Sequence, residues 1–214
     1  ATRAYKEKID FYLRHKINGI HVRGWESALS GDPGERGERY SKVTEIMHYA
    51  RERGILTRFT GGVEISEYLT PEQRKGAIER DPGTAYIWSA FDAHRQKARQ
   101  YARFLKDADA AKFVLHCIDM GPYTDPQQWS ERSPQDRQRY DDDERYLADY
   151  EVYKTYFDII REACPNIRLE AVGKPYHFTW LLPDFPDKYE RYGEGLPSPS
   201  RVRVWRSTGS SPFV

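Results

Sequence analysis

Hydrophobic side chains recur at the spacing of an amphipathic helix in four segments of the chain. The four stripes are Tyr5, Ile9, Tyr12 and Leu13; Val43, Ile46, Met47 and Ala50; Ala98, Tyr101, Ala102 and Leu105; and Leu147, Tyr150, Phe157, Ile160 and Cys164. Gly54 and Pro165 closely follow the second and fourth segments, and both residue types are typical of helix ends. Asp92 is placed to cap the start of the third helix.

A short run of residues typical of a β-strand follows each of these helical segments. The runs cover residues 17–23, 55–60, 113–119 and 167–172. Because helix, link and strand occur in the same order each time, the sequence predicts an α/β fold with parallel strands. We expect residues 1–180 to form this barrel-type domain. Residues 181–214 are rich in proline and glycine, and we expect irregular chain there, with one short strand at 201–205.

The links between the predicted elements are unequal in length. Each helix is joined to the following strand by about one to six residues, which is an ordinary loop length. The links from strand to helix are much longer and cover residues 24–40, 61–91 and 120–144. Long loops at one end of the strands are typical of a (β/α)-barrel, which builds its site from them. A doubly wound open sheet is the alternative, but no glycine-rich nucleotide motif follows any predicted strand.

The number of strands predicts only part of a TIM barrel. Closure needs about eight strand–helix units, whereas the sequence indicates four strands, or five with residues 201–205. An open half-barrel leaves two sheet edges unpaired, which favours association. We therefore expect the missing strands to come from the remainder of a larger chain, from a partner or from a second copy in a homo-oligomer.

Composition and charge exclude several classes of function. The 34 basic and 33 acidic side chains leave a net charge of +1, so no basic surface for a nucleic-acid partner is expected. No apolar run approaches the ~20 residues of a membrane span. The two cysteines make neither a disulfide framework nor a zinc motif. Aromatic residues, at 14%, are numerous enough to build a core and still line a binding site.

Several ionisable residues are predicted to face away from the helices. Side chains alternate between the two faces of a strand, and the more apolar face must pack beneath the helices. The residues that this turns toward the barrel axis are His21, Arg23, Arg58, His116 and Glu170. Two interpretations stay open: a structural ion-pair network, or a polar cup that binds a hydroxyl-rich or anionic ligand.

Further candidate residues stand where the predicted strands end. Asp119 closes the third strand, where barrel enzymes keep acids and bases, and a backbone-capping role is its alternative. Glu64 follows the second strand. The aromatic residues at strand ends that suit stacking on sugar rings are Trp25, Tyr123, Tyr176 and Trp180. Lys174 and His177 belong to the last of these segments.

Three stretches of the chain resemble the barrel of hexosaminidase-like glycoside hydrolases, with families 20 and 84 as the nearest comparisons. They are residues 114–121 (Val-Leu-His-Cys-Ile-Asp-Met-Gly), the helix after Trp129, and the strand that leads into Lys174-Pro175-Tyr176. The resemblance covers roughly residues 4–180. Those families hydrolyse N-acetylhexosaminides with two adjacent acids at the end of a strand. Asp119 matches the first acid, and Met120 stands at the position of the second.

The resemblance implies a glycoside hydrolase-like domain that acts on a carbohydrate ligand by carboxylate acid/base chemistry. Asp119 would be the acid or would orient the substrate, with Glu170 or Glu64 as the second carboxylate. The residues that would hold hydroxyl or carboxylate groups of the sugar are Arg23, Arg58 and His116. The stacking walls would be Trp25, Tyr176 and Trp180. A secreted or periplasmic location is implied as well.

Two other functions fit the same pattern. One is a non-catalytic carbohydrate-binding barrel, which would keep the aromatic cup without a competent acid pair. The other is a metal-dependent sugar isomerase or lyase on a similar barrel. His21, His116 and Asp119 are conceivable metal ligands, but no H-x-x-x-H or H-E-x-x-H spacing joins them. We therefore expect no metal and no cofactor.

Overall fold

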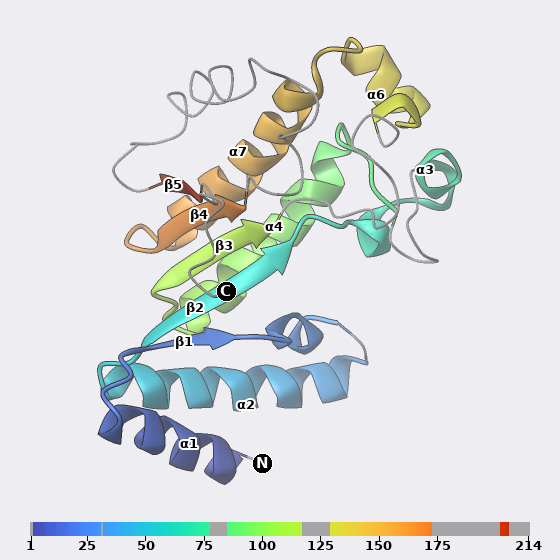
Figure 1. Ribbon diagram of the computed structural model, residues 1–214. Helices are drawn as coiled ribbons and strands as arrows, with labels where there is room; N and C mark the ends of the chain where they lie inside the picture. The colour runs from blue at the N-terminus through green and yellow to red at the C-terminus, as the bar shows by residue number, and fades with distance from the viewer. Residues whose placement is uncertain (1, 31, 78–84, 117–128, 173–201, 206–214) are drawn as a thin grey trace, which may run out of the picture.

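Five parallel strands form a single sheet in the computed structural model (Figure 1). The strands are β1 (Gly19–Val22), β2 (Leu56–Gly62), β3 (Lys112–His116), β4 (Arg168–Val172) and β5 (Val202–Trp205). The structure describes residues 2–30, 32–77, 85–116, 129–172 and 202–205. Each strand pairs with the next one along the chain, so the order across the sheet is β1-β2-β3-β4-β5.

This strand order distinguishes a barrel-type winding from a doubly wound open sheet. A doubly wound sheet reverses direction partway, so its spatial order differs from the chain order. Here every step across the sheet goes in the same direction, as in a (β/α)-barrel. The predicted fold class, a partial TIM barrel, is therefore confirmed. The described part of the chain supplies five strands, where a closed barrel has about eight.

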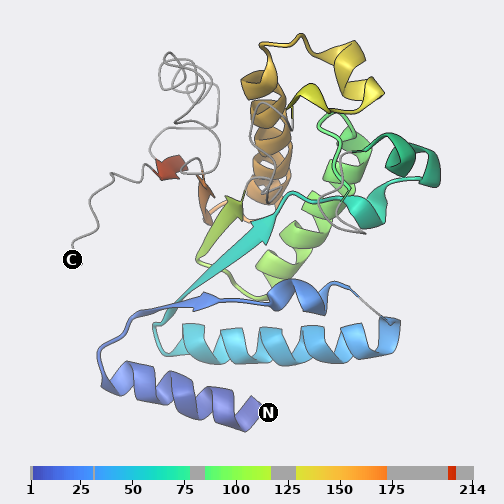
Figure 2. The same ribbon diagram turned by 45° about the vertical axis from the view of Figure 1, so that its right-hand side comes forward.

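The long helices lie on one side of the sheet, with α2, α4 and α7 along its face and α1 beside α2 (Figures 1 and 2). They are α1 (Thr2–Arg14), α2 (Pro33–Glu52), α4 (Phe91–Asp107) and α7 (Arg145–Ala163). The short elements between a strand and the following long helix are η1 (Trp25–Ala28), η2 (Ser66–Tyr68), α3 (Pro71–Gly76) and α6 (Pro134–Arg139). None of the helices in the described ranges has the length and apolar character of a membrane span.

The four predicted helices are present, and most of their ends follow the expected local chemistry. Gly54 lies just beyond α2 with a φ of 76°, the left-handed conformation that glycine adopts without strain. Pro165 follows Cys164, the residue that caps the C-terminus of α7. The predicted capping role of Asp92 is wrong. Its carboxylate accepts from Arg95 at 2.7 Å, and the N-cap position of α4 is taken by Ala90.

The first link from strand to helix is shorter than predicted. We expected residues 24–40 to be loop, but α2 already begins at Pro33. The side chain of Asp32 caps this helix by accepting from the backbone N–H of Gly34 at 2.9 Å. Proline at the first helical position adds to the same start signal. What stays between β1 and α2 is mainly the short helix η1.

Aromatic rings fill the space between the sheet and α4. Phe59 and Phe113 are register partners on β2 and β3, and the ring of Trp25 packs against both. On its other side the Trp25 ring stacks on Phe104 of α4, with centroids 4.8 Å apart. Burial of each such ring contributes roughly 2–3 kcal/mol to the free energy of folding. This cluster fixes α4 against the middle of the sheet.

Candidate functional site

A row of basic side chains crosses the sheet face that is turned away from the helices. His21, Arg58, Lys112 and Arg168 are register partners on four neighbouring strands, so their side chains leave the sheet on the same side. A contact of 2.9 Å between His21 Nε2 and Thr60 Oγ1 joins β1 to β2 on this face. Partial burial, followed by the charges of Arg58 and a neighbouring arginine, lowers the pKa of His21. The face is therefore already crowded with positive charge.

Glu170 lies in the next row along the strands and is bound by two of these cations. Its side chain is buried, with Oε2 at 2.6 Å from Lys112 Nζ and Oε1 at 3.1 Å from Arg168 Nε. A buried carboxylate needs such partners to offset the cost of leaving water. For Glu170 the structure thus matches the ion-pair interpretation: both carboxylate oxygens are engaged within the sheet.

Two carboxylates gather where β1 and β2 end. Glu26 of η1 is exposed, and its Oε1 accepts from the backbone N–H of Gly62 at 3.4 Å. The carboxylate of Glu64 folds back over the same residue. A Cβ at Gly62 would lie 2.1 Å from Glu64 Oε2, so a side chain at this position would displace the carboxylate. Both acids therefore stand beside one backbone unit, at the strand end where barrels carry their sites.

A buried lysine lies next to the two carboxylates. Lys97 of α4 is 8% exposed, and its Nζ donates to the carbonyl oxygen of Glu64 at 2.5 Å. Burial lowers the pKa of Lys97, and the carboxylates of Glu64, Glu26 and Glu67 oppose that shift. Because a buried cation requires nearby negative charge, Lys97 gives a physical reason for the three glutamates to gather here.

Tyr101, one helical turn beyond Lys97, holds Glu26 in place. Its hydroxyl donates to the Glu26 carboxylate, and the carbonyl oxygen of Gly62 lies 3.0 Å away from the same hydroxyl. Burial, and then the charge of Glu26, raises the pKa of Tyr101 well above its ordinary value. The hydroxyl therefore stays protonated and remains a donor at neutral pH.

His116 stands in the same row as Gly62, on the neighbouring strand β3. Adjacent strands are about 4.8 Å apart. The half-buried His116 therefore lies one strand away from Gly62, the residue that the Glu64 carboxylate covers. The arrangement places a histidine and carboxylates at the same end of the sheet. Within the described ranges, however, no three His, Cys, Asp or Glu side chains are grouped so that they could hold a metal ion.

The prediction that Trp25 forms a stacking wall for a sugar is wrong. Its ring is 1% exposed and packs on the helix side of the sheet, where its Nε1 donates to the carbonyl oxygen of Thr60 at 2.8 Å. Gly24 explains the error. Its φ of 68° turns the backbone just before Trp25. The alternation of side chains that places His21 and Arg23 on the axis face therefore does not extend to Trp25.

The other predicted residues divide into two groups. Arg23 is exposed just beyond β1, and Arg58 is half-buried, with an Nε atom that has no hydrogen-bond partner among the described residues. Arg23 is available to a polar ligand on the axis side, whereas the Nε atom of Arg58 is shielded from solvent. The predicted residues that lie outside the described ranges are Asp119, Tyr123, Lys174, Tyr176, His177 and Trp180.

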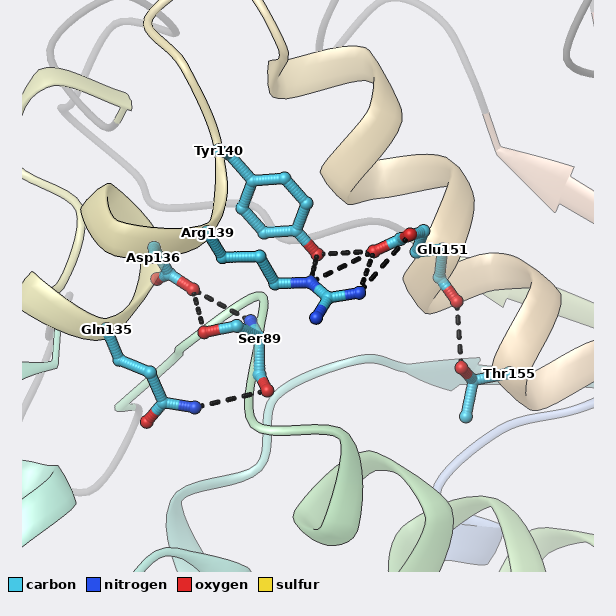
Figure 3. A network of polar contacts seen from close by, with 7 residues as sticks. All are labelled: Ser89, Gln135, Asp136, Arg139, Tyr140, Glu151 and Thr155. Carbon is cyan, nitrogen blue, oxygen red and sulfur yellow. Dashed lines mark hydrogen bonds and ion pairs between the residues drawn. The ribbon is translucent and has the colours of Figure 1, made fainter.

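A polar network fixes the segment that leads into α4 (Figure 3). The buried carboxylate of Asp136 in α6 accepts from the backbone N–H and the hydroxyl of Ser89, at 2.7 and 2.6 Å. Further along, the hydroxyl of Tyr140 and the guanidinium of Arg139 donate to Glu151 of α7, at 2.7 and 3.1 Å. These bonds join α6 to the segment around Ser89 and to α7. They therefore hold the start of α4, the helix that carries Lys97 and Tyr101 to Glu26 and Glu64; these four residues are called the acidic site below.

Sequence reasoning assigned no site role to Lys97 or Tyr101, and it placed Glu26 at the end of the first predicted strand without giving it a chemical role. The usable signal was Lys97 itself, a charged residue on the same helical face as the apolar Ala98 and Tyr101. Lysine is almost never fully buried unless it is paired, so this position indicated acidic partners. The partners could not be identified, because η1 and α4 are far apart in the chain.

Solved barrel structures share the arrangement of this sheet and its helices. A mutant O-GlcNAc hydrolase from Thermobaculum terrenum matches with a TM-score of 0.59 at 11% identity, over 95% of this chain and 37% of that one. The chitobiase of Flavobacterium johnsoniae matches with a TM-score of 0.52 at 12% identity, over 80% of this chain and 29% of that one. No protein-family model and no curated protein sequence matches the chain.

These likenesses define the class of fold. The chain has the fold of part of a TIM barrel, so the resemblance predicted from the sequence is confirmed at the level of the fold alone. It spans about a third of the length of the two proteins, 37% of one and 29% of the other. The described sheet accordingly corresponds to part of their barrels.

Proposed function

We propose that this chain forms the carbohydrate-binding and acid/base part of a glycoside hydrolase-like barrel. The observation that carries the proposal is the pair of carboxylates, Glu26 and Glu64, beside Gly62 at the end of β2. A pair of carboxylates that flank the scissile bond is the chemical equipment of glycoside hydrolysis. The two solved structures of the same fold, named as a hydrolase of O-GlcNAc and a chitobiase, support a carbohydrate as the substrate class.

Each residue of the acidic site has a distinct part in this proposal. Glu64 is the acid or base, since its carboxylate lies over Gly62 on the axis face. Tyr101 is a positioning residue that fixes Glu26 through its hydroxyl. Lys97 is a positioning residue that fixes the backbone of Glu64. Asp119, three residues beyond the end of β3, supplies a further acid.

The basic row has the complementary part, which is to bind the sugar. Glu170 would not exchange a proton with the substrate, because Lys112 and Arg168 already bind its carboxylate. Its role in the proposal is to order those two cations at the base of the site. Arg23 and Arg58 would then donate to hydroxyl or carboxylate groups of the ligand.

The test compares Glu64→Gln with Glu72→Gln, a matched control at the exposed start of α3. A panel of 4-nitrophenyl glycosides, including the N-acetyl-β-glucosaminide, measures hydrolysis. Amide NMR shifts during titration with N-acetylglucosamine measure binding. We expect Glu64→Gln to lower kcat/KM by at least ~100-fold, with the sugar-induced shifts near Gly62 and His116 retained and with the control unchanged.

Three results would contradict parts of this proposal. Hydrolysis that is unaffected by Glu64→Gln would remove Glu64 from the reaction. Binding of N-acetylglucosamine without hydrolysis of any glycoside would identify a non-catalytic carbohydrate-binding barrel instead. A wild-type chain that neither hydrolyses a glycoside nor shows a sugar-dependent shift would reject the carbohydrate assignment as a whole.

A further inference from the structure

The hydroxyl of Tyr156 is a buried donor without a described acceptor. Tyr156 belongs to α7, and its side chain is fully buried. Its hydroxyl oxygen has no hydrogen-bond partner among the described residues. Leaving such a group unbonded is unfavourable, because a buried hydroxyl has given up its hydrogen bonds to bulk water. Most buried hydroxyls are bonded to protein or to an ordered water, so an acceptor for Tyr156 is expected nearby.

Tyr156 packs against the residue that holds Glu26 in place. The ring centroids of Tyr156 and Tyr101 are 6.0 Å apart. The hydroxyl of Tyr101 donates to Glu26 and lies 3.0 Å from the carbonyl oxygen of Gly62, and the carboxylate of Glu64 covers Gly62. A single aromatic ring therefore separates Tyr156 from the two carboxylates of the acidic site.

The charge of Glu64 acts on the hydroxyl of Tyr156. Burial raises the pKa of Tyr156 well above its ordinary value, and Glu64 is the first of the charges that add to this shift, ahead of Tyr68 and Glu26. The hydroxyl therefore stays protonated at neutral pH and remains a donor. Two polar groups that lie within electrostatic range of each other, but not in direct contact, are commonly joined by an ordered water.

The carboxylate of Glu64 needs support that α4 does not give it. Lys97 donates to the backbone carbonyl oxygen of Glu64, whereas Tyr101 holds the carboxylate of Glu26. A carboxylate that exchanges protons with a substrate has to be held in place by neighbouring groups. A donor on α7 would give the side chain of Glu64 the support that Tyr101 gives to Glu26.

We propose that Tyr156 binds one buried water, which accepts from its hydroxyl and donates to the carboxylate of Glu64. A buried water needs about two to four polar partners, and these two groups supply the first two. Tyr156 is then a further positioning residue. This role rests on the proposed function of Glu64, whereas the hydrogen-bonded link between the two side chains does not. In this arrangement α4 holds one carboxylate of the acidic site and α7 holds the other.

The sign of the stability change in Tyr156→Phe tests the hydrogen-bonded link. Phenylalanine keeps the ring and removes only the hydroxyl. Because the link stabilises the fold, we expect the urea midpoint of unfolding to fall by about 0.5 M. The decrease should shrink by at least about half in a Glu64→Ala background, where the acceptor is gone. In the control background Glu72→Ala, which changes an exposed residue of α3, the decrease should keep its full size.

Kinetics on a glycoside that the wild type hydrolyses test the positioning role. Tyr156→Phe should lower kcat by about fivefold or more and leave KM unchanged, because Tyr156 is buried away from the substrate and only the placement of Glu64 changes. The matched control is Tyr40→Phe, which removes a hydroxyl that donates to Asp107 at 2.7 Å, at the C-terminal end of α4. This control also loses a hydrogen bond, but it should keep the wild-type kcat and KM.

The outcomes separate the link, the positioning role and the proposed function. A urea midpoint that Tyr156→Phe leaves unchanged or raises would overturn the link, because the hydroxyl would then be truly unbonded. A decrease of the same size in the Glu64→Ala background would place the acceptor elsewhere. A confirmed link with an unchanged kcat would reject the positioning role and leave the proposed function intact. A wild-type chain that hydrolyses no glycoside would reject both, while the unfolding data would still decide the link.

Discussion

His94 makes the stability of this fold depend on pH, because its imidazole is buried as a neutral ring. The side chain is fully buried near the start of α4, with Nε2 at 3.0 Å from the carbonyl oxygen of Ile87. A carbonyl oxygen only accepts, so Nε2 carries the proton. Nδ1 has no hydrogen-bond partner among the described residues, and the rings of Tyr86 and Tyr156 pack around the imidazole. No described group there would accept a hydrogen bond from a protonated Nδ1.

The size of the effect follows from the two pKa values. Burial lowers the pKa of His94 from 6.5 to about 3, while its hydrogen bond to Ile87 acts in the opposite direction. Below about pH 6.5 the unfolded chain takes up a proton that the folded protein does not bind, so the stability decreases toward pH 3. The slope approaches ~1.4 kcal/mol per pH unit. Between pH 7 and pH 5 the protein should lose about 2 kcal/mol through this group.

The measurement is urea unfolding at the two pH values, followed by tryptophan fluorescence. Glutamine at position 94 keeps an N–H donor for Ile87 and does not titrate. On acidification the wild type should lose about 2 kcal/mol more than His94→Gln. The control is His48→Gln, which replaces an exposed histidine and should keep the wild-type pH dependence. Identical pH dependence in the wild type and His94→Gln would refute the assignment of a buried neutral imidazole.

Two further substitutions test the packing around the site. Gly61→Ala should destabilise the fold by about 1–3 kcal/mol in the same urea assay, because the new Cβ would lie 2.6 Å from Tyr101 Cε2. The control is Gly37→Ala in α2, where a new Cβ meets nothing within 4 Å. This control should be neutral or stabilising. Asp136→Asn should cost about 1–3 kcal/mol, because an amide nitrogen would replace Oδ2, which accepts from the hydroxyl of Ser133 at 2.8 Å and from the backbone N–H of Trp88 at 3.3 Å. Thermal midpoints equal to that of the wild type would show that the Asp136 network contributes nothing.

Local periodicity was sufficient to predict the order of elements and the sheet. The stripes through Ile46 and Met47, and through Phe157 and Ile160, correspond to the buried faces of α2 and α7. Alternation along β2 correctly separated Phe59 from Arg58, because one face of a covered sheet must be apolar. The start of α2 was missed although Asp and Pro mark it, since no apolar stripe begins until ten residues later at Val43.

The candidate site was less accessible to sequence reasoning, because it is a product of tertiary packing. Alternation cannot be extended across Gly24, whose backbone turn moves Trp25 from the expected axis face into the core. The charges of Glu26 and Lys97 come within electrostatic range of each other only when η1 and α4 pack at the end of β2. The sequence does contain both charges, but nothing local in it indicates that one lies next to the other.

One helix connects the core of the fold to the acidic site. Phe104 of α4 is part of the aromatic cluster beneath the sheet, while Lys97 and Tyr101 of the same helix reach the end of β2. Because these side chains belong to one rigid element, a displacement of α4 would disturb core packing and the position of Glu26 together. The close approach of Tyr101 to Gly61 leaves little room for such a shift. Glu26, though it lies in a short helix between strand and helix, is thus positioned by the scaffold, as the acid/base chemistry proposed above would require.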